Sequence, residues 1–245
     1  MKMNENDILN SERKFTGTTI TNNPEFEKNG YLVLKNIWDP EEIYSPVPKE
    51  RGRICYVNSK EYFHEEVDKD FGCEYGKSII SRYRPPFYHE NWNKIKLEIE
   101  KTIGKKLLKT YYYDRFYFPN VELYRHVDRP ACEISVSLHI GTNLDKPWPL
   151  WIKTPDTYNE DKTKKLSQGK NVAVILNPGD ALLYKGCERP HWRDRMPEPT
   201  AKKWIFFKDK KRIDNCYYHQ IFFHYVLSDG ERVEYANENF IYPNG

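Results

Sequence analysis

The chain has 245 residues, which suits one sizeable domain with a terminal extension. Its 39 basic and 36 acidic residues leave a net charge of +3, and this near balance argues against a dedicated nucleic-acid-binding protein. Five scattered cysteines without a Cys-x-x-Cys pair argue against a disulfide framework and a structural zinc site, and no apolar run reaches membrane-spanning length. We therefore expect a cytoplasmic protein that does not bind membranes.

The first part of the chain is predicted to combine a polar tail with helical structure. Residues 1–23 are polar and short of apolar anchors, so we expect a flexible tail before a single domain over 24–245. Residues 24–104 are predicted to form a helical part of this domain. Within it, apolar residues of 89–103 recur at helical spacing and Gly104 suits a helix end, which predicts a helix packed on the outside of a sheet.

Shorter elements are predicted before that helix. We expect a short helix at 24–29, a strand at 31–35 and a helical turn at 40–43. The segment 45–84 contains several Pro and Gly residues and is predicted to be irregular and to cover the entrance of a site. Together with the basic loop 196–215, this segment is predicted to act as a substrate lid.

From residue 105 the pattern changes to short strands separated by Pro and Gly turns. Residues 132–140 alternate, with Ile and other apolar side chains on one face and Ser135, Ser137 and His139 on the other. Many short strands after a helical beginning indicate a mainly β jelly roll with flanking helices, whose core spans 105–235. The remaining strands are predicted at 110–118, 121–128, 148–152, 171–176, 181–184, 219–227 and 232–235.

Three residues carry the strongest chemical signal, namely His126, Asp128 and His191. Side chains alternate along a strand, so His126 and Asp128 point to one side if they share a strand. A second histidine from a distant strand, His191, then completes one face of an octahedral metal ion and leaves positions for a cosubstrate and oxygen. This is the two-His-one-carboxylate arrangement of Fe(II) oxygenases. The plain alternative is that all three are ordinary residues near turns.

Several segments carry motifs in a fixed order, at 26–34, 113–117, 126–135, 148–149, 178–184, 191–193 and 220–225. This series resembles the 2-oxoglutarate/Fe(II)-dependent dioxygenase superfamily over nearly the whole chain. It is most similar to prolyl-4-hydroxylase-like proteins and their bacterial and phage relatives, while its beginning resembles phytanoyl-CoA-hydroxylase-type members. The order is the strongest point of likeness, because the iron strand comes first, the Gly-Asp turn follows, and the distal histidine comes directly after.

The resemblance implies a double-stranded β-helix of cupin-like shape, with Fe(II) bound by His126, Asp128 and His191 and 2-oxoglutarate as cosubstrate. It implies that 2-oxoglutarate is decarboxylated to succinate and CO₂ while an unactivated C–H bond of a peptidyl-prolyl or small-molecule substrate is hydroxylated, with ascorbate as reductant. Asp128 argues against a halogenase, which needs the carboxylate position for chloride. The sequence leaves the substrate and the oligomeric state open.

The group that would bind the distal carboxylate of 2-oxoglutarate departs from the family's pattern. The family carries an Arg or Lys on the strand after the distal histidine, but residues 219–224 contain neither. Two candidates remain. Arg193 is preferred, because it shares a face with His191 if that stretch is extended, and Lys203 has the spacing from the distal histidine that is seen in prolyl hydroxylases.

Two further residues are predicted at the cosubstrate pocket. Tyr117 stands where prolyl hydroxylases place a tyrosine near 2-oxoglutarate, although a core aromatic is the plain alternative, and Ser135 is expected to line the pocket. The missing anchor leaves a second function open, that of a catalytically inactive, cupin-type metal-binding protein. Zinc hydrolysis on the same ligands is less favoured, because the motif places no general base.

Overall fold

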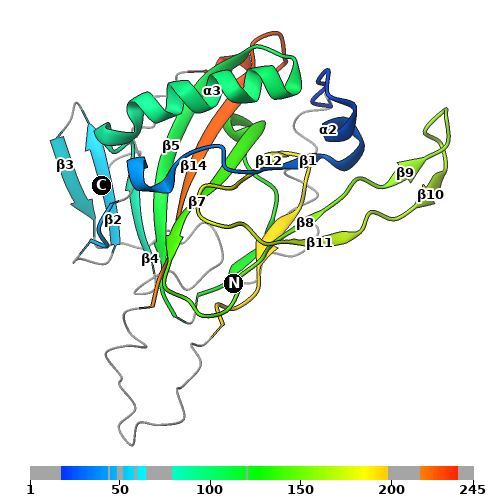
Figure 1. Ribbon diagram of the computed structural model, residues 1–245. Helices are drawn as coiled ribbons and strands as arrows, with labels where there is room; N and C mark the ends of the chain where they lie inside the picture. The colour runs from blue at the N-terminus through cyan, green and yellow to red at the C-terminus, as the bar shows by residue number, and fades with distance from the viewer. Residues whose placement is uncertain are drawn as a thin grey trace, which may run out of the picture.

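The computed structural model describes residues 18–43, 45–48, 52–57, 60–64, 79–119, 121–197 and 216–236. In these residues, two β-sheets pack face to face and the helices lie outside the larger sheet (Figure 1). Apolar side chains of β8 (Leu150–Lys153), β11 (Asn171–Val174) and β12 (Ala181–Lys185) fill the space between the sheets, which is the arrangement of a jelly roll. No helix of the described part is long and apolar enough to cross a membrane.

The larger sheet has eight strands and extends well beyond the jelly roll. All neighbouring strands are antiparallel except β2 and β4, which run parallel. In spatial order the strands are β1 (Tyr31–Leu34), β12 (Ala181–Lys185), β7 (Ile134–Thr142), β14 (Tyr218–Leu227), β5 (Leu107–Tyr117), β4 (Ile79–Tyr83), β2 (Gly52–Val57) and β3 (Lys60–His64).

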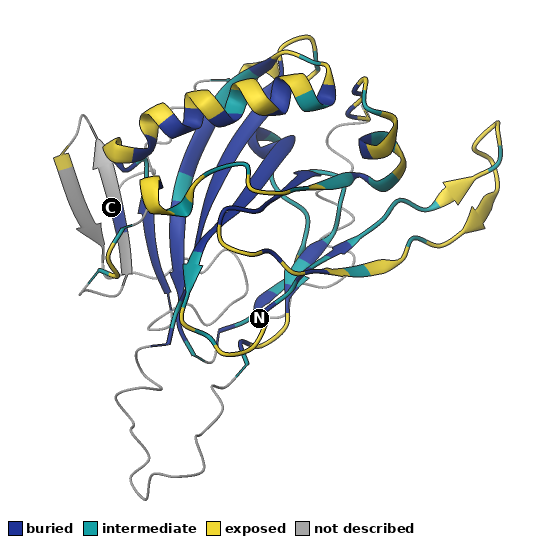
Figure 2. Ribbon diagram, in the orientation of Figure 1, coloured by how far each residue is buried: buried dark blue, intermediate teal, exposed yellow. Residues whose placement is uncertain are grey.

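The smaller sheet has four antiparallel strands and carries most of the metal-ligand motif. Its order is β11 (Asn171–Val174), β8 (Leu150–Lys153), β13 (His191–Arg193) and β6 (Leu123–His126). A hairpin of β9 (Thr157–Tyr158) and β10 (Lys165–Ser167) projects from it and is exposed (Figure 2). This hairpin was not predicted from the sequence.

The helices cover the outer face of the larger sheet. Helix α3 (His89–Ile103) presents one buried stripe to the sheet and one exposed stripe to solvent, as its spacing predicts (Figure 2). It ends at Gly104 with φ of +67°, a left-handed conformation that glycine adopts without a steric penalty. Helix α2 (Pro24–Asn29) ends in the same way at Gly30. Single 3₁₀ turns occur at Pro40–Ile43, Pro86–Tyr88, Pro130–Cys132 and Val233–Tyr235.

Strand β7 shows how alternation divides core from site. Ile134, Val136 and Leu138 pack under α3 with Ile95 and Ile99, all of them buried. Burial of each such side chain contributes about 1.5–3 kcal/mol. The hydroxyl- and imidazole-bearing residues of β7 lie on the opposite face, toward the smaller sheet, as predicted.

Two parts of the chain differ from the prediction. The segment 45–84 is not irregular throughout, because β2, β3 and β4 extend the larger sheet within it. The helical part, 24–104, therefore also contributes strands. Residues 233–235 form a 3₁₀ turn in place of the last predicted strand. Strand β4 pairs with the long edge of β5, and β2 and β3 continue the sheet from β4, so all three depend on partners that local sequence does not reveal. Of the basic loop 196–215, which was predicted to be part of a lid, only residues 196 and 197 are among the described residues.

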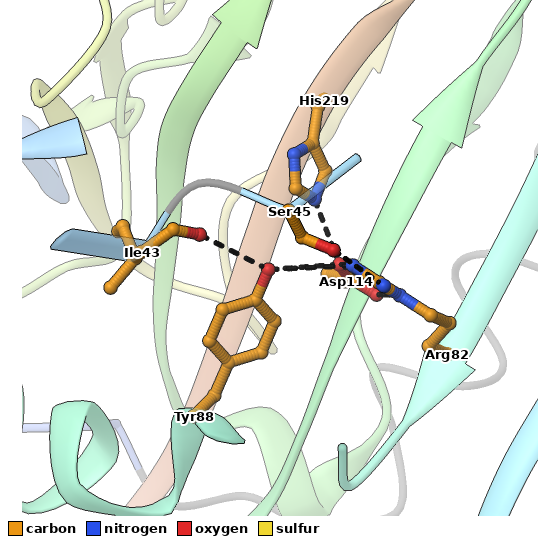
Figure 3. Close-up of polar contacts among 6 residues, drawn as sticks. All are labelled: Ile43, Ser45, Arg82, Tyr88, Asp114 and His219. Atoms are coloured by element: carbon orange, nitrogen blue, oxygen red, sulfur yellow. Dashed lines mark hydrogen bonds and ion pairs between the residues drawn. The ribbon is translucent and has the colours of Figure 1, made fainter. Parts of the chain in front are cut away.

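A buried polar cluster joins β4 to β5 on the helix-covered face (Figure 3). Asp114 is fully buried, and it accepts hydrogen bonds from Arg82 (Nε to Oδ1, 2.9 Å), from His219 (Nε2 to Oδ2, 2.8 Å) and from the Tyr88 hydroxyl (3.2 Å). Arg82 also donates to the Ser45 hydroxyl at 2.8 Å. Burial alone raises the pKa of Asp114, but the hydrogen bonds and charges of Arg82 and His219 outweigh it and lower the pKa below its ordinary value.

The substitution Asp114→Asn should lower the free energy of unfolding at pH 7 by about 3–5 kcal/mol, because Arg82 then stays buried without its counter-charge. The native carboxylate stabilises the fold fully above its ordinary pKa of 3.8 and loses this effect as the pH falls through the lower pKa of the folded state. The difference between the two proteins in urea unfolding should therefore shrink on acidification. Glu98→Gln, at an exposed pair with Lys101, should change the free energy by less than about 1 kcal/mol. Equal losses in both variants would contradict this role of Asp114.

Candidate metal centre

Two paired strands bring the predicted ligands together. His126 ends β6 and His191 begins β13, and the two residues lie directly opposite each other in the antiparallel ladder. Their ring centroids are 4.3 Å apart. Asp128 was predicted on the same strand as His126, but β6 ends at His126 and Asp128 lies in the following loop. There its backbone N–H donates a hydrogen bond to the carbonyl of Gly186 at 2.9 Å. This bond holds the Asp128 backbone in place of the hydrogen bonds of a strand ladder.

Gly186 permits the close approach of the Asp128 carboxylate. A Cβ atom at this position would lie 2.6 Å from Oδ2 of Asp128 and 2.2 Å from the carbonyl oxygen of Cys132. Both distances are far below van der Waals contact, and the second involves backbone that cannot easily move. Only glycine therefore fits where the strand β12 leads toward His191.

The ligand atoms face a common centre. Nε2 of His126 lies 3.7 Å from Oδ1 of Asp128, and Nε2 of His191 lies 3.6 Å from the same oxygen. One ligand atom from each of the three residues lies within 4.8 Å of the others. The second ring nitrogens face backbone carbonyls, with Nδ1 of His126 2.7 Å from Tyr124 and Nδ1 of His191 3.0 Å from Arg189. A carbonyl only accepts, so Nδ1 carries the proton and each Nε2 lone pair points toward the carboxylate.

The protonation states of His126 and Asp128 suit a divalent cation. Burial, together with repulsion from His191, lowers the pKa of His126 to about 4, so its imidazole is neutral at pH 7. Burial raises the pKa of Asp128, but its interactions with His191 and His126 and the hydrogen bond from Ser135 outweigh burial, so its pKa is lowered and the carboxylate stays ionised. A neutral imidazole and an ionised carboxylate, as His126 and Asp128 have at pH 7, are the protonation states that a metal ion requires of such ligands.

Ser135 supports the carboxylate from behind. Its hydroxyl lies 2.9 Å from Oδ2 of Asp128 and 3.0 Å from Nδ1 of His224. One hydroxyl can accept from His224 and donate to Asp128, so the three groups form a chain that orients the carboxylate. Ser135 was predicted to line the cosubstrate pocket; the structure places it beside Asp128, and it is not among the described residues that line the cavity.

A cavity opens beside the three converging side chains, all of which line it. One wall is a series of parallel aromatic rings, with Tyr113 4.9 Å from Tyr83 and 4.6 Å from Phe222 between ring centroids. The ring of His224 stacks on Tyr111 at 4.6 Å, and Nε2 of His224 has no hydrogen-bond partner among the described residues. The polar residues of the lining include Tyr111, Tyr113, Tyr117, Arg115, Arg129 and His224.

The predicted cosubstrate-binding residues have different locations. Tyr117 lines the cavity, is fully buried, and its hydroxyl has no partner in the part of the chain that the structure describes. Arg193 is on the buried side of β13 with His191, but it does not line the cavity. Its guanidinium donates to the Trp148 carbonyl and, at 2.7 Å, to Oε1 of Gln220. Lys203 lies outside the described residues.

Two cavity residues were missed by sequence reasoning. Arg115 has the same parity as Tyr117 on β5, and this alternation was a signal that would have found it. His219 and His224 lie on opposite faces of β14, where His219 pairs with Asp114 and His224 lines the cavity.

No family model matches the sequence, and a search among curated proteins finds no match either. Solved structures are similar at low identity. HygX from Streptomyces hygroscopicus, with nickel and 2-oxoglutarate bound, has a TM-score of 0.50 at 11% identity, covering 84% of this chain and 85% of that one. AviO1 from Streptomyces viridochromogenes has a TM-score of 0.48 at 12% identity, with coverages of 85% and 96%. A prolyl-4-hydroxylase from Pseudomonas putida has a TM-score of 0.48 at 10% identity, with coverages of 82% and 95%.

The likeness to HygX concerns the fold. It extends over most of both chains, and the strand order of this protein pairs two sheets in the same jelly-roll arrangement. The predicted mainly β jelly roll of double-stranded β-helix type is therefore confirmed.

The geometry predicts how metal binding responds to substitution. Asp128→Ala should abolish tight binding of Ni(II), because it removes the one charged ligand atom. Ser135→Ala should weaken binding about 10–100-fold, since it removes the hydrogen bond that orients this carboxylate. The exposed His89 provides the control, and His89→Ala should bind as the wild type does. Calorimetric titration measures all four affinities, and unchanged binding by Asp128→Ala would exclude this site.

Proposed function

We propose that this protein is an Fe(II)- and 2-oxoglutarate-dependent dioxygenase. The observation that supports this most strongly is the convergence of the two Nε2 atoms and the carboxylate oxygen of His126, His191 and Asp128 beside an aromatic-walled cavity. In both histidines the protonated Nδ1 is held by a backbone carbonyl, so the lone pairs of the two Nε2 atoms are directed at one point. A pair of histidines in a structural role would not need this common orientation.

The donor set fits Fe(II) and a 2-oxo acid. Two imidazole nitrogens and one carboxylate oxygen are the ligands of the facial triad, and the cavity that all three residues line is open to a cosubstrate. When bound, iron and 2-oxoglutarate would supply an oxidation by O₂, in which one oxygen atom enters the succinate formed with CO₂ from 2-oxoglutarate and the other enters the hydroxyl group formed at a substrate C–H bond. Ascorbate would serve as reductant.

The protein's own residues would position the metal ion and limit the access of water to the cavity. His126, Asp128 and His191 hold the metal, and Ser135 orients the carboxylate between them. The stacked rings of Tyr83, Tyr113 and Phe222 form one wall of the cavity, and this wall would limit the access of water from its side. Arg129 lines the same cavity with its guanidinium 4.5 Å above the ring of Tyr111, where it would meet a bound small molecule or peptide.

One observation favours a second function, that of a cupin-type metal-binding protein without turnover. The strand after the distal histidine, β14, faces the barrel interior with Gln220, Phe222 and His224 and has no Arg or Lys. An enzyme that uses 2-oxoglutarate needs a cation for the distal carboxylate. The two functions therefore differ in whether 2-oxoglutarate binds and is consumed.

The dioxygenase should release succinate from 2-oxoglutarate in air with Fe(II) and ascorbate, and candidate small molecules or prolyl peptides should accelerate the release. Asp128→Ala should lower the rate by at least about 100-fold, because the metal is lost. Asp161→Asn, which changes an exposed carboxylate at the tip of the β9–β10 hairpin, should leave it unchanged. Mass spectrometry of succinate and of candidate substrates provides the measurement. Metal binding without any binding or consumption of 2-oxoglutarate would support the cupin-type alternative.

A further inference from the structure

The distal carboxylate of the cosubstrate requires a cation inside the barrel, and this inference rests on the proposed function. A 2-oxo diacid bound at its 2-oxo end to the metal carries its second carboxylate into buried surroundings. A buried carboxylate is stable only when it is paired with a positive charge or with several donors. Because β14 offers no basic side chain, the cation comes from another segment, and the described residues that line the cavity include Arg115 and Arg129.

Arg115 on β5 lies in a suitable position. It is 4% exposed and lines the same cavity as His126, Asp128 and His191. In the sheet Arg115 lies directly opposite Gln220 of β14. Strand β14 is the one on which the family carries its basic residue. Arg115 is therefore a basic residue on β5, the strand that pairs directly with β14.

The Arg115 side chain is held in one orientation. Its Nε donates to the hydroxyl of Ser81 on β4 at 2.9 Å. Its Cζ lies 5.1 Å and 5.7 Å from the ring centroids of Tyr113 and Tyr117. A guanidinium oriented by a hydrogen bond and two rings provides the rigid planar fork that matches a carboxylate.

Tyr117 supplies an independent sign of a ligand. Tyr117 lines the cavity. Its hydroxyl is fully buried and lacks a hydrogen-bond partner among the described residues. Buried hydroxyl groups in folded proteins are almost always paired, so an unpaired one beside a cavity indicates a partner that binds there. Tyr117 and Arg115 lie on the same face of β5, so one anion can contact both.

The position of Ser81 is fixed by its neighbour on β4, Arg82, whose side chain lies on the other face of the strand. Ser81 faces the cavity side and contacts Arg115, whereas the next residue, Arg82, faces the helix-covered side and pairs with Asp114 (Figure 3). Strand β4 therefore holds two consecutive residues of β5, one on each face. The buried ion pair of Arg82 and Asp114 keeps the register in which Ser81 reaches the guanidinium of Arg115.

Arg193, the residue preferred from the sequence, is placed differently. It is 1% exposed and its Cζ lies 4.6 Å from the ring centroid of Trp148 and 4.5 Å from that of Tyr218. Its donors reach the Trp148 carbonyl and Gln220, and it is not among the lining residues of the cavity. These contacts tie β13 to β14 across the barrel.

We propose that Arg115 binds the distal carboxylate of 2-oxoglutarate together with the Tyr117 hydroxyl, and that Ser81 is the positioning residue that orients it. Strand β5 then provides the anchor that the family takes from the strand after the distal histidine.

The test combines a change in the ligand with a change in the protein. The ligands are 2-oxoglutarate and 2-oxopentanoate, which keeps the 2-oxo acid but has a methyl group in place of the distal carboxylate. Calorimetry on Ni(II)-loaded protein measures both affinities without turnover. The wild type should bind 2-oxoglutarate about 100-fold more tightly than 2-oxopentanoate. Arg115→Gln should reduce this preference to less than about 5-fold while the affinity for Ni(II) itself is unchanged.

Arg193→Gln is the matched control and should keep the wild-type preference, because this residue ties two strands and lies away from the cavity. An unchanged preference in Arg115→Gln, or a preference lost only in Arg193→Gln, would overturn the assignment of Arg115. A wild type that fails to bind Ni(II), or that binds Ni(II) but neither 2-oxo acid, would instead refute the proposed function. The two failures are therefore distinguishable.

Two milder variants keep the test decisive if circular dichroism shows that Arg115→Gln does not fold. Arg115→Lys retains the charge but loses the planar fork, so the preference for 2-oxoglutarate should fall about 10-fold. Ser81→Ala should weaken 2-oxoglutarate binding several-fold and leave the affinity for 2-oxopentanoate as it is. A purely structural serine would change both affinities equally. Preferences equal to that of the wild type in both variants would contradict the proposal.

Discussion

The pairing of β6 with β13 is the constraint on which the candidate metal centre depends. The antiparallel ladder places His126 opposite His191, and backbone carbonyls two residues before each histidine hold both Nδ1 atoms. The orientation of the ligands is therefore set by main chain, which is the least mobile part of a sheet. Asp128 completes the set from a loop, and it needs Gly186 to leave space and Ser135 to hold its second oxygen.

Strand β5 joins the stability of the fold to the chemistry of the cavity. Its residues alternate between Arg115 and Tyr117 on the inner face and Asp114 on the outer face, where the buried cluster with Arg82 lies. One short strand, β4, contacts both sides through Ser81 and Arg82. A change in the outer ion pair would consequently reach the inner guanidinium through the register of the two strands, without any contact with the cavity itself.

The agreement between sequence and structure is best where a signal is local and periodic. Helix 89–103 and the alternation of β7 could be predicted because each depends on the spacing of apolar residues over one element. Strands β2 and β4 were missed because β4 forms by pairing with β5, farther along the chain, and β2 by pairing with β4, while their own residues carry no clear alternation. The position of Asp128 beyond the end of β6 was missed for the same reason, since the ladder ends where the partner strand ends.

The residue types of the candidate centre, their order along the chain and the jelly-roll class follow from sequence patterns, because ligand chemistry and hydrophobic period are properties of the residues themselves. Which basic group stands beside the centre did not follow from them. Arg193 and Arg115 carry the same guanidinium group, but in the folded chain Arg193 is occupied by Trp148 and Gln220, whereas Arg115 on β5 lines the cavity. The charge of a side chain is a property of the residue type. The groups that surround the side chain are brought there by long-range pairing of strands, which exists only in the folded chain.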